Sequence, residues 1–192
     1  DFPDVEIEIS EGSLTQIRRL LLDEGVDTGI VAGTSTAPFD HQADILRNEE
    51  VLFAIPVNHP YRLTNPDRPI RVSELMREFS GDNFIMSKQG SSLRMVYDQL
   101  FEKLSFQPKA MCETNSISTI RHLIASRSGV SFIAESCSQD RDTIAYYSLE
   151  PRIYRMNLLV RRRNWVMNEP EQVFCSMIRN YFILNDEYPF LA

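Results

Sequence analysis

The hydrophobic pattern changes period within residues 84–104 and predicts a strand, a loop and a helix. A short apolar run comes first, and a loop of small polar residues (87–92) follows it. From Leu93 onward, apolar residues recur at i, i+3, i+4, i+7, i+8 and i+11, the spacing of a helix with one apolar face. Ser91 or Ser92 is placed to cap this helix.

The chemistry of this loop admits two interpretations. A strand that enters a helix through Ser and Gly residues leaves backbone N–H groups and hydroxyls facing open space. The helix dipole adds partial positive charge there, which suits an anion or a carboxylate. An ordinary strand-to-helix turn with a capping serine needs the same residue types. Taken alone, the stretch favours the ordinary turn.

The N-terminal pattern predicts a βαβ unit. Residues 5–9 alternate apolar and acidic side chains, as in a strand with one wet face. Ser13 is placed to cap a helix over 14–23, and Gly25 stands where a left-handed C-terminal cap belongs. Residues 28–32 form a short apolar strand pattern. We therefore expect two parallel strands joined by a right-handed crossover.

Small polar residues also follow this second strand. Gly33, Thr34, Ser35 and Thr36 come directly after its last apolar residue. In open α/β sheets, ligands bind outside the carboxyl ends of the strands. We therefore expect the loop at Ser13 and the loop at 33–36 to emerge at one edge and to contribute to a binding site.

The rest of the chain predicts a second α/β half. The expected elements are a strand at 51–55, an irregular link from Asn58 to Pro69, a short helix at 73–76, a strand at 109–114, a helix from 117 that ends before Gly129, strands at 130–134, 144–149 and 153–160, and a C-terminal helix capped by Asn168. Residues 84–134 then form a βαβαβ-like run with polar loops at 87–92 and 115–116. Two such halves suggest two lobes that face each other across a cleft.

Charge and composition narrow the function classes. The 192 residues carry a formal net charge of −7, and the basic residues are scattered except at 161–163. Phosphate binding needs a concentrated basic face, so we do not expect this chain to hold a nucleic acid by itself. We interpret 161–163 as a solvated strand end. No apolar run approaches the roughly 20 residues that span a bilayer, so we expect no membrane partner.

Cysteine and histidine usage predicts neither a disulfide framework nor a metal site. The three cysteines are widely spaced, and an odd number fits a reducing compartment, so we expect a cytoplasmic location. The three histidines, at 41, 59 and 122, stand singly and support no metal or catalytic pair. We expect no catalytic residue, no metal and no cofactor.

Six segments follow one another in an order and spacing more specific than any of them alone. They are Phe-Pro-Asp-Val-Glu-Ile at 2–7, the helix end and strand at 25–30, the strand that closes with Asn-His-Pro at 51–60, Gly-Ser-Ser at 90–92, Glu-Thr-Asn-Ser at 113–116, and the helix and strand at 123–133. Together they cover essentially the whole chain, which resembles the effector-binding regulatory domain of LysR-type transcriptional regulators. Departures occur at Thr28 and Gly29 and at Arg127-Ser128-Gly129, which replaces the family's usual small residues and Gly-x-Gly.

The resemblance implies an α/β fold like that of type 2 periplasmic binding proteins, with two Rossmann-like α/β lobes joined by two crossing strands. Lobe I would comprise residues 1–57 plus 161–192, and lobe II residues 58–160. Domains of this family normally begin with a further strand and helix, preceded by a winged helix-turn-helix that binds DNA. We expect these parts to be missing from this chain.

Matched position by position, the resemblance implies a ligand site built from small polar residues at strand ends. The residues are Ser13, Gly33, Thr34, Ser87, Gly90, Ser91, Asn115 and Ser116. Hydroxyls, an amide and glycine N–H groups are what a loop that hydrogen-bonds a ligand needs. Any one of these residues, taken alone, could instead serve as a helix cap or turn residue. Because four such loops are expected to converge, we favour ligand contact as the role of the group.

The resemblance also implies partners. We expect a small-molecule effector, a carboxylate or another anion, to bind between the lobes. Similar domains form homodimers, so we expect a homodimer here and a tetramer in the full-length protein, with DNA bound only through the missing N-terminal domain.

Three other functions stay open. The shared fold permits a solute-binding protein of a transporter. An enzyme of the same fold is the next alternative, but no catalytic constellation supports it. The third alternative is redox sensing at Cys112 or Cys137, because some regulators of this family sense peroxide through cysteine.

Overall fold

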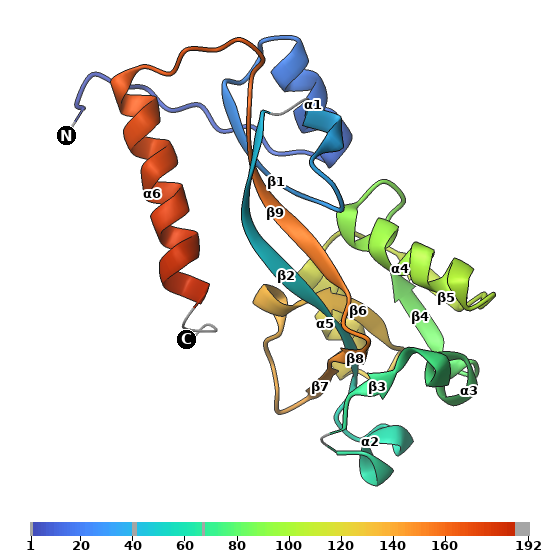
Figure 1. Cartoon of the computed structure of the whole chain (residues 1–192). Helices are drawn as coiled ribbons and strands as arrows, with labels where there is room; N and C mark the ends of the chain where they lie inside the picture. Colours follow the sequence, from blue (N-terminus) through green and yellow to red (C-terminus); the bar gives the residue numbers. More distant parts are fainter. Residues whose placement is uncertain (1, 40–41, 67, 187–192) are drawn as a thin grey trace. The chain divides into compact units, whose positions relative to one another are not determined.

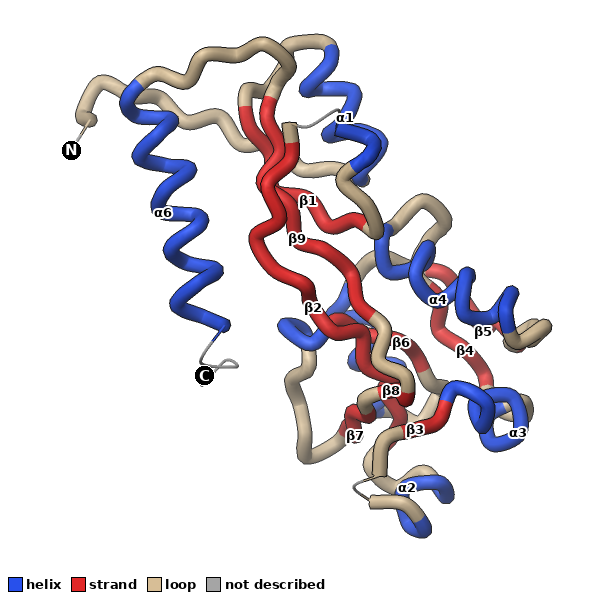
Figure 2. Tube along the Cα trace, in the orientation of Figure 1, coloured by secondary structure: helices blue, strands red, loops and turns tan. Residues whose placement is uncertain are grey.

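Two compact units make up the chain. Unit 1 comprises Asp1–Asn48 and Met156–Ala192, and unit 2 comprises Glu49–Arg155. The computed structural model describes residues 2–39, 42–66 and 68–186 (Figures 1 and 2). Both divisions between the units lie inside long strands, β2 (Ala43–Pro56) and β9 (Tyr154–Arg161).

Unit 1 is built on strands covered by helices on both faces. Strand β1 (Thr28–Gly33) pairs antiparallel with β9. Helix α1 (Leu14–Leu22) and the short 3-10 helix η1 (Ala37–Phe39) pack on one face, through a buried cluster of Ile17, Leu21, Val31, Phe39, Leu158 and Val160. Helix α6 (Glu169–Asp186) packs on the other face through Leu159, Cys175 and Ile178. Successive strand residues point to opposite faces, so Leu158 packs on the α1 side of the strands and Leu159 on the α6 side.

The first predicted strand is not formed. Residues 5–9 adopt no regular structure, and the side chains that should be its dry face are exposed, at 45% for Val5, 72% for Ile7 and 80% for Ile9. An alternating pattern makes one face apolar, but a strand also needs a neighbour to accept its backbone hydrogen bonds. No described segment pairs with residues 5–9, so the expected βαβ unit is wrong, and β1 takes an antiparallel partner instead.

The end of α1 also differs from the prediction. Glu24, not Gly25, has the left-handed backbone, with φ of 59°. The Gly25 N–H donates to the Leu20 carbonyl at 2.8 Å, which is the long hydrogen bond of a Schellman motif. Gly25 thus occupies the position after the left-handed residue, where a Cβ would come within 3.1 Å of the Leu20 side chain.

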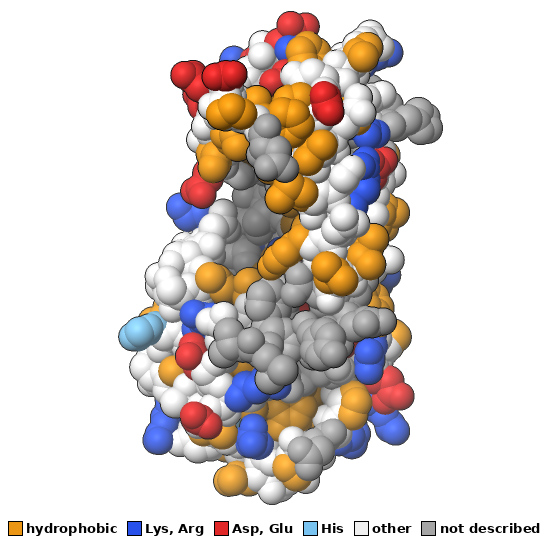
Figure 3. All heavy atoms as spheres, turned by 90° about the vertical axis from the view of Figure 1, so that its left-hand side faces the viewer, with side chains coloured by type: hydrophobic (Ala, Val, Ile, Leu, Met, Phe, Trp, Pro, Cys, Tyr) orange, Lys and Arg blue, Asp and Glu red, His pale blue; other side chains and the backbone are white. Residues whose placement is uncertain are grey.

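Helix α6 carries an apolar stripe, most of which is exposed. Ile178 is buried, whereas Val173, Phe174, Met177 and Tyr181 lie between 42% and 64% exposed. Figure 3 views the molecule from the α6 side, and apolar side chains gather there on unit 1. Asn168 caps the helix as expected: its Oδ1 accepts from the Glu171 N–H at 3.0 Å, and Glu171 accepts from the Asn168 N–H at 2.8 Å.

Unit 2 contains the predicted βαβαβ run. Strand β4 (Asn83–Met86) leads into α4 (Ser92–Lys103), and β5 (Lys109–Glu113) leads into α5 (Ile117–Ala125). Strands β4 and β5 are parallel, and Phe84 makes a parallel bridge to Val130, just before β6 (Ser131–Ala134). This arrangement confirms the run expected from the sequence and places the starts of α4 and α5 at the carboxyl ends of neighbouring strands.

The remaining elements of unit 2 close its core. Strand β2 pairs antiparallel with β6 and with β7 (Ile144–Tyr147), and β3 (Ile70–Arg71) pairs with β8 (Leu149–Glu150). Three short helices, α2 (Pro60–Thr64), the 3-10 helix η2 (Val72–Glu74) and α3 (Leu75–Phe79), and the 3-10 helix η3 (Glu135–Cys137) complete the unit. The core is aromatic: Phe53 packs edge-on against both Phe79 and Phe132.

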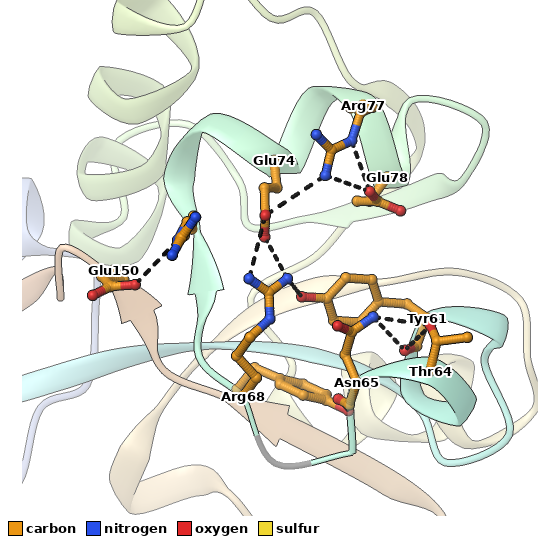
Figure 4. Close-up of polar contacts among 10 residues, drawn as sticks. Tyr61, Thr64, Asn65, Arg68, Glu74, Arg77, Glu78 and Glu150 are labelled. Carbon is orange, nitrogen blue, oxygen red and sulfur yellow. Dashed lines mark hydrogen bonds and ion pairs between the residues drawn. The ribbon is translucent and has the colours of Figure 1, made fainter.

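A polar network holds the α2 segment, which the sequence treats as an irregular link. Figure 4 shows Arg68 reaching both oxygens of Glu74, at 3.3 and 2.8 Å, and the Tyr61 hydroxyl at 3.4 Å. The Tyr147 hydroxyl donates to the Asn65 carbonyl at 3.1 Å. These bonds fix a segment that has little secondary structure of its own.

Candidate functional site

Two polar loops of unit 2 meet at one edge of its parallel strands. The first runs from Ser87 to Ser91 after β4, and the second from Thr114 to Ser116 after β5; we call them the unit 2 loops. The Lys88 N–H donates to Asn115 Oδ1 at 3.0 Å and joins the two loops directly. Five of the eight predicted site residues therefore lie together in this one place.

The first loop presents the start of α4. Ser91 caps the helix, and its hydroxyl accepts from the Arg94 N–H at 3.2 Å. Gly90 has φ of 80° and open space around the position of a Cβ, so this turn requires the left-handed conformation that glycine tolerates. The first N–H groups of a helix have no partner within it, so the α4 N-terminus retains donors beside the capping hydroxyl.

The second loop gathers hydroxyls at the start of α5. Ser116 caps the helix by accepting from the Thr119 N–H at 3.3 Å, and it also accepts from the Thr119 hydroxyl at 2.9 Å. The Ser118 hydroxyl lies 3.1 Å from that of Ser116. Thr114 Oγ1 accepts from the Ser116 N–H at 3.1 Å. The cluster is exposed except for the half-buried Thr114, so hydroxyls that can donate or accept face solvent there.

Arg94 ties both loops to α4. Its guanidinium donates to both oxygens of Asp98 at 2.7 and 2.8 Å, to Glu113 Oε1 at 2.8 Å and to the Ser87 carbonyl at 2.9 Å. Burial alone would lower the pKa of Arg94, but the hydrogen bonds to Glu113 and Asp98 raise it. One guanidinium thus pairs with both carboxylates beside the unit 2 loops, and the three groups keep a net charge of −1.

Ser87 is a buried anchor. It is 3% exposed, and its N–H donates to the Tyr97 hydroxyl inside the core. Burial raises the pKa of Tyr97, although the Ser87 hydrogen bond opposes that shift. Ser87 therefore fixes the start of the loop, while Gly90, Ser91, Asn115 and Ser116 form its more accessible part.

The other three predicted residues lie in unit 1. Ser13 caps α1 in a capping box, in which it accepts from the Gln16 N–H at 3.3 Å and its own N–H donates to Gln16 Oε1 at 2.8 Å. Gly33 ends β1, and Thr34 begins the loop after it. Helix α1 and β1 are joined by a short connection and run in opposite directions, so Ser13 and Thr34 lie at the same end of unit 1.

Sequence reasoning missed three contributors. Arg94 is not among the predicted residues, because nothing in the helical spacing connects it to Glu113 or to Ser87. Ser118 and Thr119 were missed as members of the hydroxyl cluster, although their spacing from the capping Ser116 could have revealed them.

The described residues offer no metal-binding cluster and no membrane-spanning helix, and two of their three cysteines are half-buried. Among residues 2–39, 42–66 and 68–186, no group of three or more His, Cys, Asp or Glu side chains could hold a metal ion. No helix in the same ranges is long and apolar enough to cross a membrane. Cys112 and Cys137 are half-buried and pack on one apolar cluster with Ile85, Ile120 and Ile124, while Cys175 is buried.

Comparison with known proteins identifies the family. Residues 1–182 match the family described as LysR substrate binding domain. An uncharacterized HTH-type transcriptional regulator, YybE of Bacillus subtilis (strain 168), is 32% identical over 99 residues, which are 52% of this chain and 32% of that protein. The chain spans about half the length of the curated relatives it matches.

Two solved structures share the fold. The regulatory domain of Synechocystis PCC6803 CcmR, in complex with 2-PG, gives a TM-score of 0.78 at 18% identity and covers 94% of this chain and 85% of that one. The effector binding domain of QuiR, in complex with shikimate, gives a TM-score of 0.70 at 20% identity and covers 88% and 78%. These likenesses confirm the expected α/β fold of the type 2 periplasmic-binding-protein kind.

The family match bears on the enzyme alternative. The matched family consists of regulator domains, which provide no reason to look for an enzyme. With the fold and nearly the whole length matched, this chain belongs to the LysR substrate-binding domains, the effector-binding part of LysR-type regulators.

Proposed function

We propose that the chain senses a small anionic metabolite through the unit 2 loops, and that Ser13, Gly33 and Thr34 of unit 1 also contact this ligand. In the full-length regulator, ligand binding would shift the arrangement of a homodimer or tetramer and so reposition the DNA-binding domains. Such coupling between sites typically amounts to about 1–3 kcal/mol.

The observation that carries this proposal is the hydrogen bond from Lys88 to Asn115. It holds two helix N-termini, each capped by a serine, beside one another at the carboxyl ends of parallel strands. Helix N-termini offer N–H donors and partial positive charge, which favour an anion over a cation. The hydroxyls of Ser91, Ser116 and Ser118 add donors that suit carboxylate or hydroxyl oxygens.

The two acidic side chains near the loops are both paired. Glu113 and Asp98 are the carboxylates that contact this region through Arg94, and both are paired with its guanidinium. The three groups together keep a net charge of −1, so the preference for an anion rests on the helix N-termini and hydroxyls. Shikimate, the ligand in the QuiR complex, is itself a carboxylate, so a carboxylate ligand has a precedent in the shared fold.

The test separates capping from ligand binding. Aspartate is as good a helix cap as serine, so Ser116→Asp keeps the α5 cap but adds a negative charge to the hydroxyl cluster. We expect calorimetry with shikimate, benzoate and citrate to find binding to the natural chain, at least about tenfold weaker to Ser116→Asp, because like charges repel at short range. Putrescine, a cation, should not bind at the same place.

The matched control is Ser126→Asp, which introduces the same charge at an exposed serine after α5, away from the unit 2 loops. It should bind the anions as the natural chain does. Binding of putrescine in preference to the three anions, or equal anion binding by both variants, would overturn the proposal.

A further inference from the structure

A pocket of about 250 Å³ opens in unit 2 at the end of β2, separate from the unit 2 loops. Pro56, Pro60 and Val130 form its apolar walls, and Asn58, His59, Asp82 and Arg127 provide its polar groups. Small-molecule sites typically combine apolar walls with a few convergent polar groups. None of the predicted site residues lines this pocket.

Arg127 stands at a position that favours glycine. It follows α5 with φ of 63°, and the Ser128 N–H donates to the Leu123 carbonyl at 2.9 Å, the long bond of a Schellman motif. A residue with a side chain is strained in this conformation, and such strain tends to accumulate at functional sites.

Arg127 pairs with the Asn58 side chain. In the amide orientation that satisfies both groups, the Asn58 oxygen accepts from all three guanidinium nitrogens, at 2.8 Å from Nε, 2.7 Å from Nη2 and 3.0 Å from Nη1. Among the described residues, no carboxylate forms an ion pair with Arg127. The remaining N–H groups of the guanidinium can therefore take up a carboxylate.

Asp82 supplies the opposite charge. Its Oδ1 lies 3.2 Å from His59 Nε2, and the His59 Nδ1 accepts from the Tyr61 N–H at 3.1 Å. Because Nδ1 is an acceptor, the ring proton is on Nε2 and is donated to Asp82. Stacking against Phe79, at 5.4 Å between ring centroids, holds the imidazole in place. In the described part of the chain, the second oxygen of Asp82 has no partner.

The pocket holds a guanidinium that pairs with no described carboxylate and a carboxylate that is only partly satisfied, and this combination disfavours simple ions. A ligand with only a negative charge would be attracted by Arg127 but repelled by Asp82. A ligand with only a positive charge would be attracted by Asp82 but repelled by Arg127. We propose that this pocket binds the zwitterion of a small α-amino acid, with its carboxylate on Arg127, its ammonium on Asp82 and a short apolar side chain against the two prolines and Val130.

Three probes test both charges at once. L-alanine carries both groups, propionate is alanine without its amine, and ethylamine is alanine without its carboxylate. In NMR titrations of the 192-residue chain, we expect L-alanine to shift the amides of Gly129 and Val130. We expect it to bind at least about tenfold more tightly than either partial probe, since each partial probe lacks one of the two hydrogen bonds to a charged group.

Two variants assign the charges. Arg127→Asn keeps a residue that tolerates positive φ and removes the guanidinium, so alanine should bind no better than ethylamine. Asp82→Asn keeps an acceptor for His59 and removes the charge, so alanine should bind no better than propionate. Arg163→Asn, at an exposed arginine of unit 1, is the matched control and should bind alanine normally.

The outcomes are decisive in either direction. Failure of alanine to bind, equal binding of propionate, or unchanged binding by Arg127→Asn and Asp82→Asn would each overturn the proposal. Shifts centred on Ser91 and Ser116 instead of Val130 would place alanine in the unit 2 loops and also overturn it. Because Ser116→Asp leaves this pocket intact, anion binding at those loops and amino-acid binding here succeed or fail independently.

Discussion

The Arg94 guanidinium lies 2.8 Å from the Glu113 carboxylate and thereby links the first turn of α4 to the end of β5. The same side chain donates to the Ser87 carbonyl, where β4 ends. One residue thus fixes the spacing of the two strand ends from which the unit 2 loops emerge. This spacing decides whether both loops can contact the same small ligand.

Replacing Arg94 should therefore affect both stability and binding. Arg94→Ala removes three hydrogen-bonded contacts from a side chain that is only 13% exposed. We expect a loss of about 2 kcal/mol in the free energy of unfolding, measured by urea denaturation. Anion binding should weaken too, because Asp98 and Glu113 are left as unpaired negative charges beside the loops.

Arg19→Ala is the matched control for this variant. Arg19 forms the same kind of i,i+4 pair, with Asp23, but both side chains are largely exposed. Exposed pairs of this kind contribute little, so the control should change neither stability nor binding measurably. A comparable loss in both variants would contradict the role assigned to Arg94.

Asn115 should matter for order in the loops more than for overall stability. Asn115→Ala removes the acceptor of the Lys88 N–H, while both helix caps remain. We expect faster amide hydrogen exchange at Lys88 and its neighbours, with a loss of about 1 kcal/mol or less in unfolding free energy. Asn115→Asp keeps the acceptor and should keep the protection. Unchanged exchange in Asn115→Ala would refute the link.

Gly129 should not tolerate a side chain. A Cβ at this position would lie 2.4 Å from the Asn83 carbonyl oxygen, which also accepts the Val130 N–H. The backbone cannot yield without breaking that bond, so we expect Gly129→Ala to cost about 2–3 kcal/mol in thermal or urea unfolding. Gly81→Ala, which meets nothing within 4 Å, should be neutral; a similar cost in both would argue against the clash.

Glu49 should make stability depend on pH in the acid range. Its Oε1 accepts from the Ser136 N–H at 2.9 Å and its Oε2 from Arg155 at 2.8 Å. Burial alone would raise the pKa of Glu49, but the charge of Arg155 and the hydrogen bonds of Ser136 and Arg155 hold it below 4.5. A folded-state pKa below the unfolded value means that its contribution is present above about pH 4.5 and is lost as pH falls through the folded value.

Urea denaturation at several pH values below and above 4.5 tests this dependence. The natural chain should lose stability more steeply on acidification than Glu49→Gln, which has no charge to lose. Glu11→Gln, at an exposed position, should follow the natural chain. Parallel curves for all three would show that the Glu49 ion pair contributes nothing.

Local patterns were sufficient to predict most helices and the parallel run of unit 2. Apolar periodicity and capping serines located α1, α4 and α5 to within a few residues, because both signals depend on neighbours in sequence. The same logic failed at residues 5–9, where strand formation depends on a pairing partner that periodicity does not reveal. Gly25 was displaced by one position because Glu24 accepts the left-handed conformation that the prediction reserved for glycine.

The site was harder to predict than the fold, because its contacts join distant residues. Lys88 and Asn115 are 27 residues apart, and His59 and Asp82 are 23 apart, so no local spacing indicates either hydrogen bond. Small polar residues at strand ends could be identified as candidates. Their grouping, and the pocket around Arg127, follow only from the tertiary fold.

The exposed residues 5–9 have a consequence for how copies of this chain behave in concentrated solution. Val5, Ile7 and Ile9 form a short, exposed β-patterned segment that pairs with no described strand, the kind of edge that recruits another strand. Glu6 and Glu8 interrupt it with negative charges that keep two such segments apart. Added salt screens that repulsion, so this acidic chain should self-associate more readily as ionic strength rises.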